Sequence, residues 1–230
     1  MTSLSARRLR YAGLAAALIA IASGPAAAHH VGAYVPRDNE ISANFKQIKF
    51  ALQAGKFDVA ARLFETGAVR AEMQKHASRL PDGLEASTRA AIQAGDARGA
   101  ERGLVVFFVV LARDLALEAD RRLTDTREPA DVRIAAGRKF LEAIWRYYNL
   151  VDFAVTQYDS KAGVSIRLAF DEAEGYTKDP ATSTAPVSAS KAARPAAVPD
   201  PAKMREPIRR IAQTLSGLIE TSSTSQRRGP

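Results

Sequence analysis

A nine-residue apolar run, Leu104–Ala112, lies inside the segment Gly95–Leu123. Charged residues flank this run on both sides at helical spacing. A helix that is apolar all round must be enclosed by other elements, whereas nine residues are too few to cross a bilayer, which takes about 20. The pattern therefore predicts a long central helix that is the axis of the fold and whose ends reach water.

The remaining apolar residues recur at spacings of three and four, which indicates further amphipathic helices. Turn-forming glycines and prolines separate them, and no stretch alternates convincingly with a period of two. The predicted helices are Asn39 to Gly55, Phe57 to Ser78, a short third helix before Gly95, the central helix, a fifth after Glu128-Pro129 with Trp145 and Tyr148 on its apolar face, and a sixth over Gly163 to Gly175, which buries Val164, Ile166, Leu168 and Phe170 incompletely. We expect an all-α protein, an antiparallel helical bundle built from two αα-hairpins plus a long helix, with a tethered C-terminal amphipathic helix.

A short motif occurs twice, 40 positions apart, because Ala51–Gly55 matches Ala91–Gly95. Each Gly falls where one helix ends and an antiparallel one begins, which predicts the corner of an αα-hairpin used twice. The first copy resembles a tetratricopeptide hairpin over about 20 residues, with a Gly corner, an aromatic, a small residue and a second aromatic at Gly55, Phe57, Ala60 and Phe64. In the second copy Ala97 replaces the first aromatic, and the proline that ends that family's unit is missing. We favour two hairpins packed as a bundle, with a true repeat array as the alternative.

Composition divides the chain into an N-terminal targeting segment, a folded domain and a tethered helix. Residues 1–28 have three arginines, an apolar run and small residues ending at Ala28, the pattern of a secretory signal peptide. A cut after Ala33 is the alternative. We therefore expect an exported, periplasmic or secreted protein whose mature chain has no transmembrane anchor. The other predicted segments are a disordered mature N-terminus (29–38), a helical-bundle domain (39–176), a flexible Pro/Ala/Ser-rich linker (177–202), the C-terminal amphipathic helix (203–222) and a disordered tail (223–230).

The C-terminal helix has an apolar seam with arginines lying off it. The seam consists of Met204, Ile208, Ile211, Leu215 and Leu218. Two interpretations are open: the helix docks on its own bundle, or it binds a protein partner from the end of its tether.

The charge and the absence of Cys limit the classes of partner and cofactor that this chain can bind. The net charge of +8 falls to about +5 without the signal peptide, which carries three arginines and no acids. The basic residues are spread along the chain without aromatic interleaving, so we expect no nucleic-acid partner. The chain has no Cys, which excludes disulfides, thiolate metal sites, iron–sulfur clusters and covalent c-type haem.

Two of the three histidines would stand at the mature N-terminus, His29 and His30. A chain that begins at His29 offers an α-amino nitrogen and imidazole nitrogens, which favour copper among the common divalent ions. This terminus is similar to that of exported copper proteins whose mature chain begins with His. The alternative is that both histidines are the polar start of a disordered segment.

The third histidine, His76, follows Glu65 and Glu72 at spacings that place all three on one stripe of the predicted second helix. Helical bundles bind iron or manganese through Glu and His from several helices. The candidate carboxylates on other helices are Asp114 and Glu118 on the central helix and Glu142 and Asp152 on the fifth. The paired Glu-x-x-His motif of those proteins is absent. A solvated Glu72–His76 pair on the outer face is the alternative.

No motif for covalent, phosphate or zinc-dependent catalysis is present, so we expect no enzyme. The favoured hypothesis is an exported accessory protein that binds or delivers copper or iron. The alternative is a cofactor-free periplasmic adaptor of helical hairpins, which binds a protein partner through its C-terminal helix. The sequence leaves the partner and the oligomeric state open.

Overall fold

The computed structural model describes residues 37–177 and 200–227, and every regular element within these ranges is helical. The all-α prediction is therefore confirmed. The predicted signal peptide, the His29-His30 pair, nearly all of the predicted linker and residues 228–230 lie outside the described residues. The helices are α2 (Glu40–Gln53), α3 (Phe57–Glu65), α4 (Ala68–Lys75), the 3-10 turn η1 (Ala77–Arg79), α5 (Leu84–Gln93), α6 (Ala97–Thr124), α7 (Ala130–Tyr158), α8 (Ser160–Gly175) and α9 (Pro201–Arg227).

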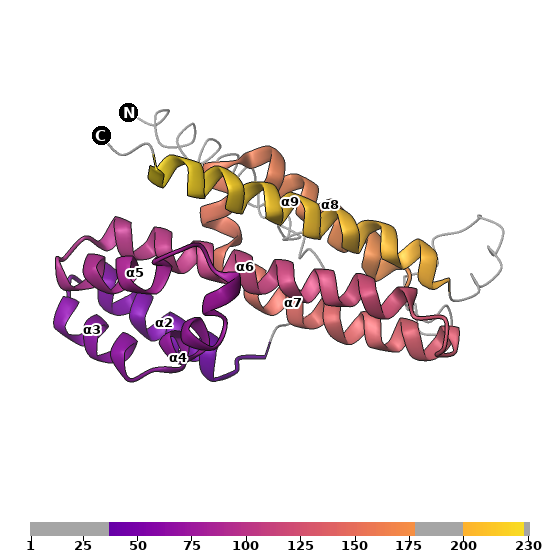
Figure 1. Cartoon of the computed structure of the whole chain (residues 1–230), viewed down its shortest axis with the longest axis horizontal. Coiled ribbons are helices and arrows are strands. Elements are labelled where there is room, and N and C mark those ends of the chain that lie inside the picture. Colours follow the sequence, from indigo (N-terminus) through magenta and orange to yellow (C-terminus); the bar gives the residue numbers. More distant parts are fainter. Residues whose placement is uncertain (1–36, 178–199, 228–230) are drawn as a thin grey trace, which may run out of the picture. The chain divides into compact units, whose positions relative to one another are not determined.

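Helix α6 is the axis around which the others pack, as the apolar run predicts (Figure 1). Its 28 residues extend about 42 Å, and α5, α7 and α9 all lie against it. The Phe108 ring lies 4.6 Å from that of Phe45 on α2 and 5.8 Å from that of Tyr147 on α7, measured between centroids. Within the described residues, none of the helices combines the length and apolarity needed to cross a membrane.

The two predicted hairpin corners have the same backbone geometry. Gly55 and Gly95 adopt positive φ angles of 68° and 73°, which glycine tolerates without steric cost. In the first corner the N–H groups of Gly55 and Lys56 donate to the carbonyls of Leu52 and Ala51, and the second corner repeats this pair of bonds 40 positions later. This is the Schellman arrangement that ends a helix and releases the chain into the next one. The duplicated αα corner is therefore confirmed.

The prediction of one continuous helix from Phe57 to Ser78 is wrong, because the chain breaks at Thr66-Gly67 and continues as α4 and η1. The buried side chain of Asn44, on α2, holds the break. Its Nδ2 donates to the carbonyl of Leu63 at 3.0 Å, and its Oδ1 accepts from the N–H of Val69 at 3.0 Å. A single amide thus satisfies both the end of α3 and the start of α4.

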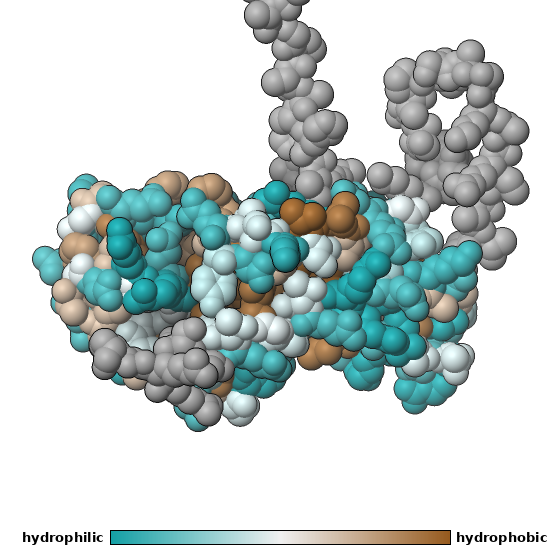
Figure 2. Space-filling model, turned by 90° about the horizontal axis from the view of Figure 1, so that it is seen from above, coloured by the Kyte–Doolittle hydropathy of each residue, from teal (hydrophilic) through white to brown (hydrophobic). Residues whose placement is uncertain are grey.

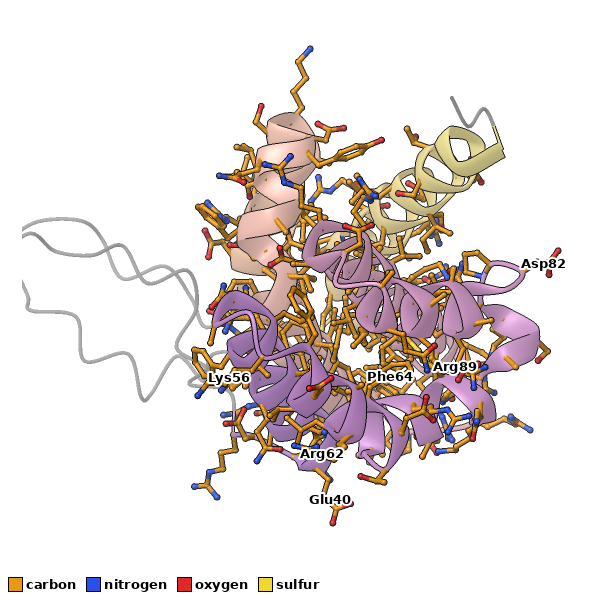
Figure 3. All side chains as sticks on the ribbon, turned by 90° about the vertical axis from the view of Figure 1, so that its left-hand side faces the viewer. Glu40, Lys56, Arg62, Phe64, Asp82 and Arg89 are labelled. Carbon is orange, nitrogen blue, oxygen red and sulfur yellow. The ribbon has the colours of Figure 1, made fainter. Side chains whose placement is uncertain are left out.

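Side chains of the first hairpin divide between interior and solvent. Figure 3 shows Phe64 directed between the helices, whereas Lys56 and Arg62 point outward. Phe64 and Ala60 are fully buried, and Ala60 allows the close helix approach expected at this position.

Helices α7 and α8 form a second type of contact, an aromatic cluster outside the hairpins. Trp145 packs edge-on to Phe170 with centroids 4.9 Å apart, and Tyr148 is fully buried beside them. On α8, Ile166 and Phe170 are buried, but Val164 and Leu168 are 52% and 62% exposed. The incomplete burial predicted for this helix is confirmed, and it affects one side only.

Helix α9 docks on the bundle, which decides between the two interpretations of the C-terminal helix. Met204, Ile208, Ile211 and Leu215 are fully buried, and α9 lies along α6 and α8 (Figure 1). Arg205 Nε donates to Asp120 Oδ1 on α6 at 2.6 Å. The backbone of α9 is helical to Arg227, beyond the predicted end at residue 222.

Candidate functional site

The three predicted metal ligands of the second helix do not share one stripe. Glu65 ends α3, and Glu72 lies on α4 beyond the break at Gly67. Glu65 pairs with Arg70 at 2.6 Å and with Arg89 of α5 at 3.9 Å. It therefore belongs to the contact between α3 and α5, and the expectation of a common stripe is wrong because it assumed an unbroken helix.

The predicted Glu72–His76 pair does form. His76 Nε2 lies 2.7 Å from Glu72 Oε1, and Arg79 contacts the other ring nitrogen, Nδ1. The His76 side chain is only 13% exposed, so the pair is largely buried instead of solvated. Both ring nitrogens already have protein partners.

His76 lies in a cleft of about 580 Å³ between α4, α6 and α7, which we call the His76 cleft. Asp114 and Glu118, the two carboxylates predicted on the central helix, line it as well. Tyr147 also lines it, and its hydroxyl accepts a 2.9 Å hydrogen bond from Asn39 Nδ2 at the start of α2. The fold thus brings together His76, Glu72 and both α6 carboxylates, but not Glu65, Glu142 or Asp152.

The two α6 carboxylates of the His76 cleft are held by arginines. Asp114 pairs with Arg113 at 2.7 Å and with Arg79 at 3.3 Å. Glu118 pairs with Arg121 at 2.5 Å, and this contact lowers the pKa of the Glu118 carboxyl. Within residues 37–177 and 200–227, no group of three or more His, Asp or Glu side chains is arranged to hold a metal ion. His29 and His30 lie outside these ranges.

A second depression runs along the first half of α6, with a volume of about 750 Å³, and we call it the α6 groove. Its apolar lining comes from four helices: Ala91 on α5, Val105, Val106 and Val109 on α6, Ala154 and Val155 on α7, and Leu218 and Ile219 on α9. Val105 and Val106 are partly exposed in it. Apolar residues are also exposed elsewhere on the molecule, for example in the middle of the face that Figure 2 shows from above, where brown residues are bordered by polar ones.

Four charged residues line the groove, and among the described residues the two acids have partners whereas the two arginines have no acidic partner. Asp96 caps α6 by accepting from the N–H of Gly99 at 2.8 Å, and Glu101 lies 3.9 Å from Lys49 of α2. Arg98 and Arg102 are exposed and have no acidic partner in the part of the chain that the structure describes. The lining therefore combines an apolar floor with two unpaired guanidinium groups.

Sequence reasoning missed this groove because it treated Leu104–Ala112 as enclosed on every side. Phe107, Phe108 and Val110 are indeed fully buried, but Val105 and Val106 are not. The only signal in the sequence is the pair Arg98 and Arg102, four residues apart and one or two turns before the valines. Burial of the valines depends on which side of α6 the distant helix α9 covers, and the local pattern does not contain that information.

A comparison of the chain with protein families, with curated proteins and with solved structures finds no match.

Proposed function

We propose that this protein is an exported, non-enzymatic interaction module of helical hairpins, which binds its partner in the α6 groove. The observation that supports this proposal is the combination of partly exposed valines with the unpaired Arg98 and Arg102. Apolar side chains left open to water are stabilised when a partner covers them.

The walls of the groove are parts of a packed scaffold, which favours specific binding. Ala91 comes from the hairpin α5–α6, and Val109 of α6 is only 3% exposed. On the opposite wall, Leu218 and Ile219 are both 8% exposed. A rigid site avoids much of the entropy cost of ordering its residues when the partner binds.

The C-terminal helix contributes to this proposal in a way that differs from the tethered-helix hypothesis. Its apolar seam is buried against its own bundle and is not available to a partner. Its distal end, at Leu218 and Ile219, is one wall of the groove. A partner would therefore meet α9 from the side, in contact with α6.

Site-specific photo-crosslinking tests the proposal. A photoreactive residue at Val106, inside the groove, should give a discrete adduct in the native host, whereas one at Val132 should not. Val132 is a matched control because it is 44% exposed on α7 and does not line the groove. Equal adducts from both positions, or none from Val106, would contradict binding in the groove.

Transition-metal binding is a second proposal, supported by the His29-His30 pair that follows the signal-peptide pattern. The amino terminus and imidazole of His29, with His30, would supply nitrogen ligands for copper. Elemental analysis with intact mass should find about one copper per chain beginning at His29. His30→Ala should lower the copper content and His76→Gln should not.

A different metal would point to a different part of the chain. Iron retained by the wild type and lost in His76→Gln would indicate the His76 cleft, where a metal would have to displace Arg79 from the ring nitrogen. A metal-free chain after anaerobic purification and reconstitution with copper and iron would remove the proposal.

A further inference from the structure

We infer that the partner presents an acidic amphipathic helix, which lies along α6 with its apolar side on Val105 and Val106 and its carboxylates on Arg98 and Arg102. This inference rests on the proposed function and specifies the occupant of the same groove. Three observations carry it: the spacing of the lining residues, the place of the groove in the hairpin series, and its unpaired positive charge.

Four of the α6 residues that line the groove form one stripe, and Val106 lies beside it. Arg98, Arg102, Val105 and Val109 are spaced by four, three and four residues, which places them on the same side of the helix. The stripe spans about 17 Å at 1.5 Å per residue. A partner helix of about three turns covers this length, with its anchors at the matching spacing of three and four residues.

The groove occupies the position at which the hairpin series would add its next helix. The second hairpin packs on the first through α3 and α5. In that contact Glu65 of α3 lies 3.9 Å from Arg89 of α5, and the Phe57 ring lies beside Gly95. The residue 40 positions after Glu65 is Val105, which lines the groove.

A series of helical hairpins needs a cover on its terminal helix, because each unit buries its apolar side against a neighbour. Val105 and Val106 remain partly exposed although α7 and α9 pack against α6 and form walls of the groove. A helix from another chain would complete the contact that α5 makes for α3.

The charges in the groove favour an acidic helix over a basic or neutral one. The acids that line it already have roles, since Asp96 caps α6 and Glu101 lies near Lys49. Arg98 and Arg102, in contrast, have no acidic partner among the described residues and stand one turn apart. Guanidinium groups bind carboxylates with two parallel hydrogen bonds, so glutamates one turn apart on the partner helix match them.

Defined peptides test the inference on the full-length mature chain. Three fluorescent peptides of about four turns share one apolar stripe and carry flanking glutamates, glutamines or lysines. Fluorescence anisotropy should show the glutamate peptide binding at least about tenfold more tightly than the glutamine peptide. Its affinity should fall as salt rises, because the contacts at the rim are screened.

A charge reversal supplies the decisive variant. Arg98→Glu with Arg102→Glu should invert the preference, so that the lysine peptide binds best. The matched control is Arg37→Glu with Arg62→Glu, since both residues are exposed and have no described ion pair. The control removes the same charge and should keep the preference for the glutamate peptide. Circular dichroism establishes that both variants remain folded.

The other outcomes separate this inference from the proposed function. Equal binding of all three peptides that is abolished by Val106→Trp would overturn the acidic helix and leave the groove as the binding site. A Val106 crosslink in the host without binding of any peptide would do the same. If dodecanoate binds in the groove and no peptide does, the occupant is a small amphiphile and the inference is wrong. Loss of the crosslink itself would count against the proposed function.

Discussion

The two αα corners of this protein begin alike and continue differently. After Gly55 the chain forms α3, which has 9 residues, whereas after Gly95 it forms α6, which has 28. Both corners share the Schellman pair of hydrogen bonds and a positive φ at Gly, and the second adds a hydrogen bond from the N–H of Ala97 to the carbonyl of Gly95. The corner therefore sets the direction of the second helix and not its length.

The length of the second helix depends on Asn44 and Gly67. Asn44 inserts its amide at the break between α3 and α4, where Gly67 leaves room for it. The residues 40 positions later are Leu84 and Phe107, which are apolar and buried, and α6 runs on without a break. The buried amide of Asn44 and the glycine at position 67 thus account for the difference in length between α3 and α6.

The largest expected effect comes from Gly67→Ala. A Cβ at this position would lie 2.2 Å from the carbonyl oxygen of Leu63 and 2.3 Å from Asn44 Oδ1, and a backbone atom cannot move aside cheaply. We expect a loss of about 3 kcal/mol in the free energy of unfolding, at the upper end for overpacking. Urea unfolding followed by circular dichroism measures it. Gly175→Ala is the control, because a Cβ there meets nothing within 4 Å, and similar losses for both variants would contradict the clash.

Asn44→Ala tests the other half of the break. It leaves the N–H of Val69 and the carbonyl of Leu63 without the amide that satisfies them. Unsatisfied buried polar groups make the expected loss about 2 kcal/mol, to be measured by chemical denaturation. Gln47→Ala, on the exposed side of the same helix, should be nearly neutral. Faster amide hydrogen exchange confined to α4 would localise the effect; unchanged exchange at Val69 would argue against it.

Gly55→Ala and Gly95→Ala test whether the two corners are equivalent. Each substitution places a Cβ in the left-handed region, which costs about 1 kcal/mol. The surroundings add little, since a Cβ at Gly55 meets nothing within 4 Å and one at Gly95 meets only the Phe57 ring at 3.7 Å. Thermal unfolding should therefore give equal losses. Gly217→Ala, inside α9 with open space around it, should not destabilise the protein. Clearly unequal losses at the two corners would contradict their equivalence.

Much of this architecture could be predicted from the sequence, because it is recorded in local patterns. The apolar run around Phe107 and Phe108 predicted the enclosed axis, and the repeated Ala-Gly ends of α2 and α5 predicted the corners. The seam of α9 predicted one buried side, although two interpretations of its partner remained until the fold placed it on α6 and α8.

The break at Gly67 could not be predicted in the same way. A Gly inside a helical pattern is usually tolerated at a cost of about 1 kcal/mol, and the residue that makes the break favourable, Asn44, lies on another helix. The error then carried over to the candidate site, since Glu65 was placed on a stripe with Glu72 and His76 that the break removes. Asp114 and Glu118 of α6 were predicted only as possible metal ligands from another helix, and the fold places both in the His76 cleft.

The end of α6 is stabilised differently from the end of α3. The break after α3 is held by a buried amide, whereas Asp125, after α6, is held by the exposed Arg127. Arg127 Nε and Nη2 lie 2.7 and 2.6 Å from the carboxylate oxygens. These hydrogen bonds, with one from the Arg127 backbone, lower the pKa of Asp125 from 3.8 to about 2.

A pKa that is lower in the folded state means that ionised Asp125 favours folding above the unfolded value and that this contribution disappears as the pH falls toward 2. Asp125→Asn should therefore be slightly less stable than the wild type at neutral pH and should converge with it near pH 2. The effect is the smallest of the series because exposed ion pairs contribute little. Urea midpoints across this range measure it, with Asp82→Asn as the control that removes one charge from an exposed turn. A difference that persists unchanged at the acid end would mean that Asp125 acts at the end of α6 through its shape and not through its charge.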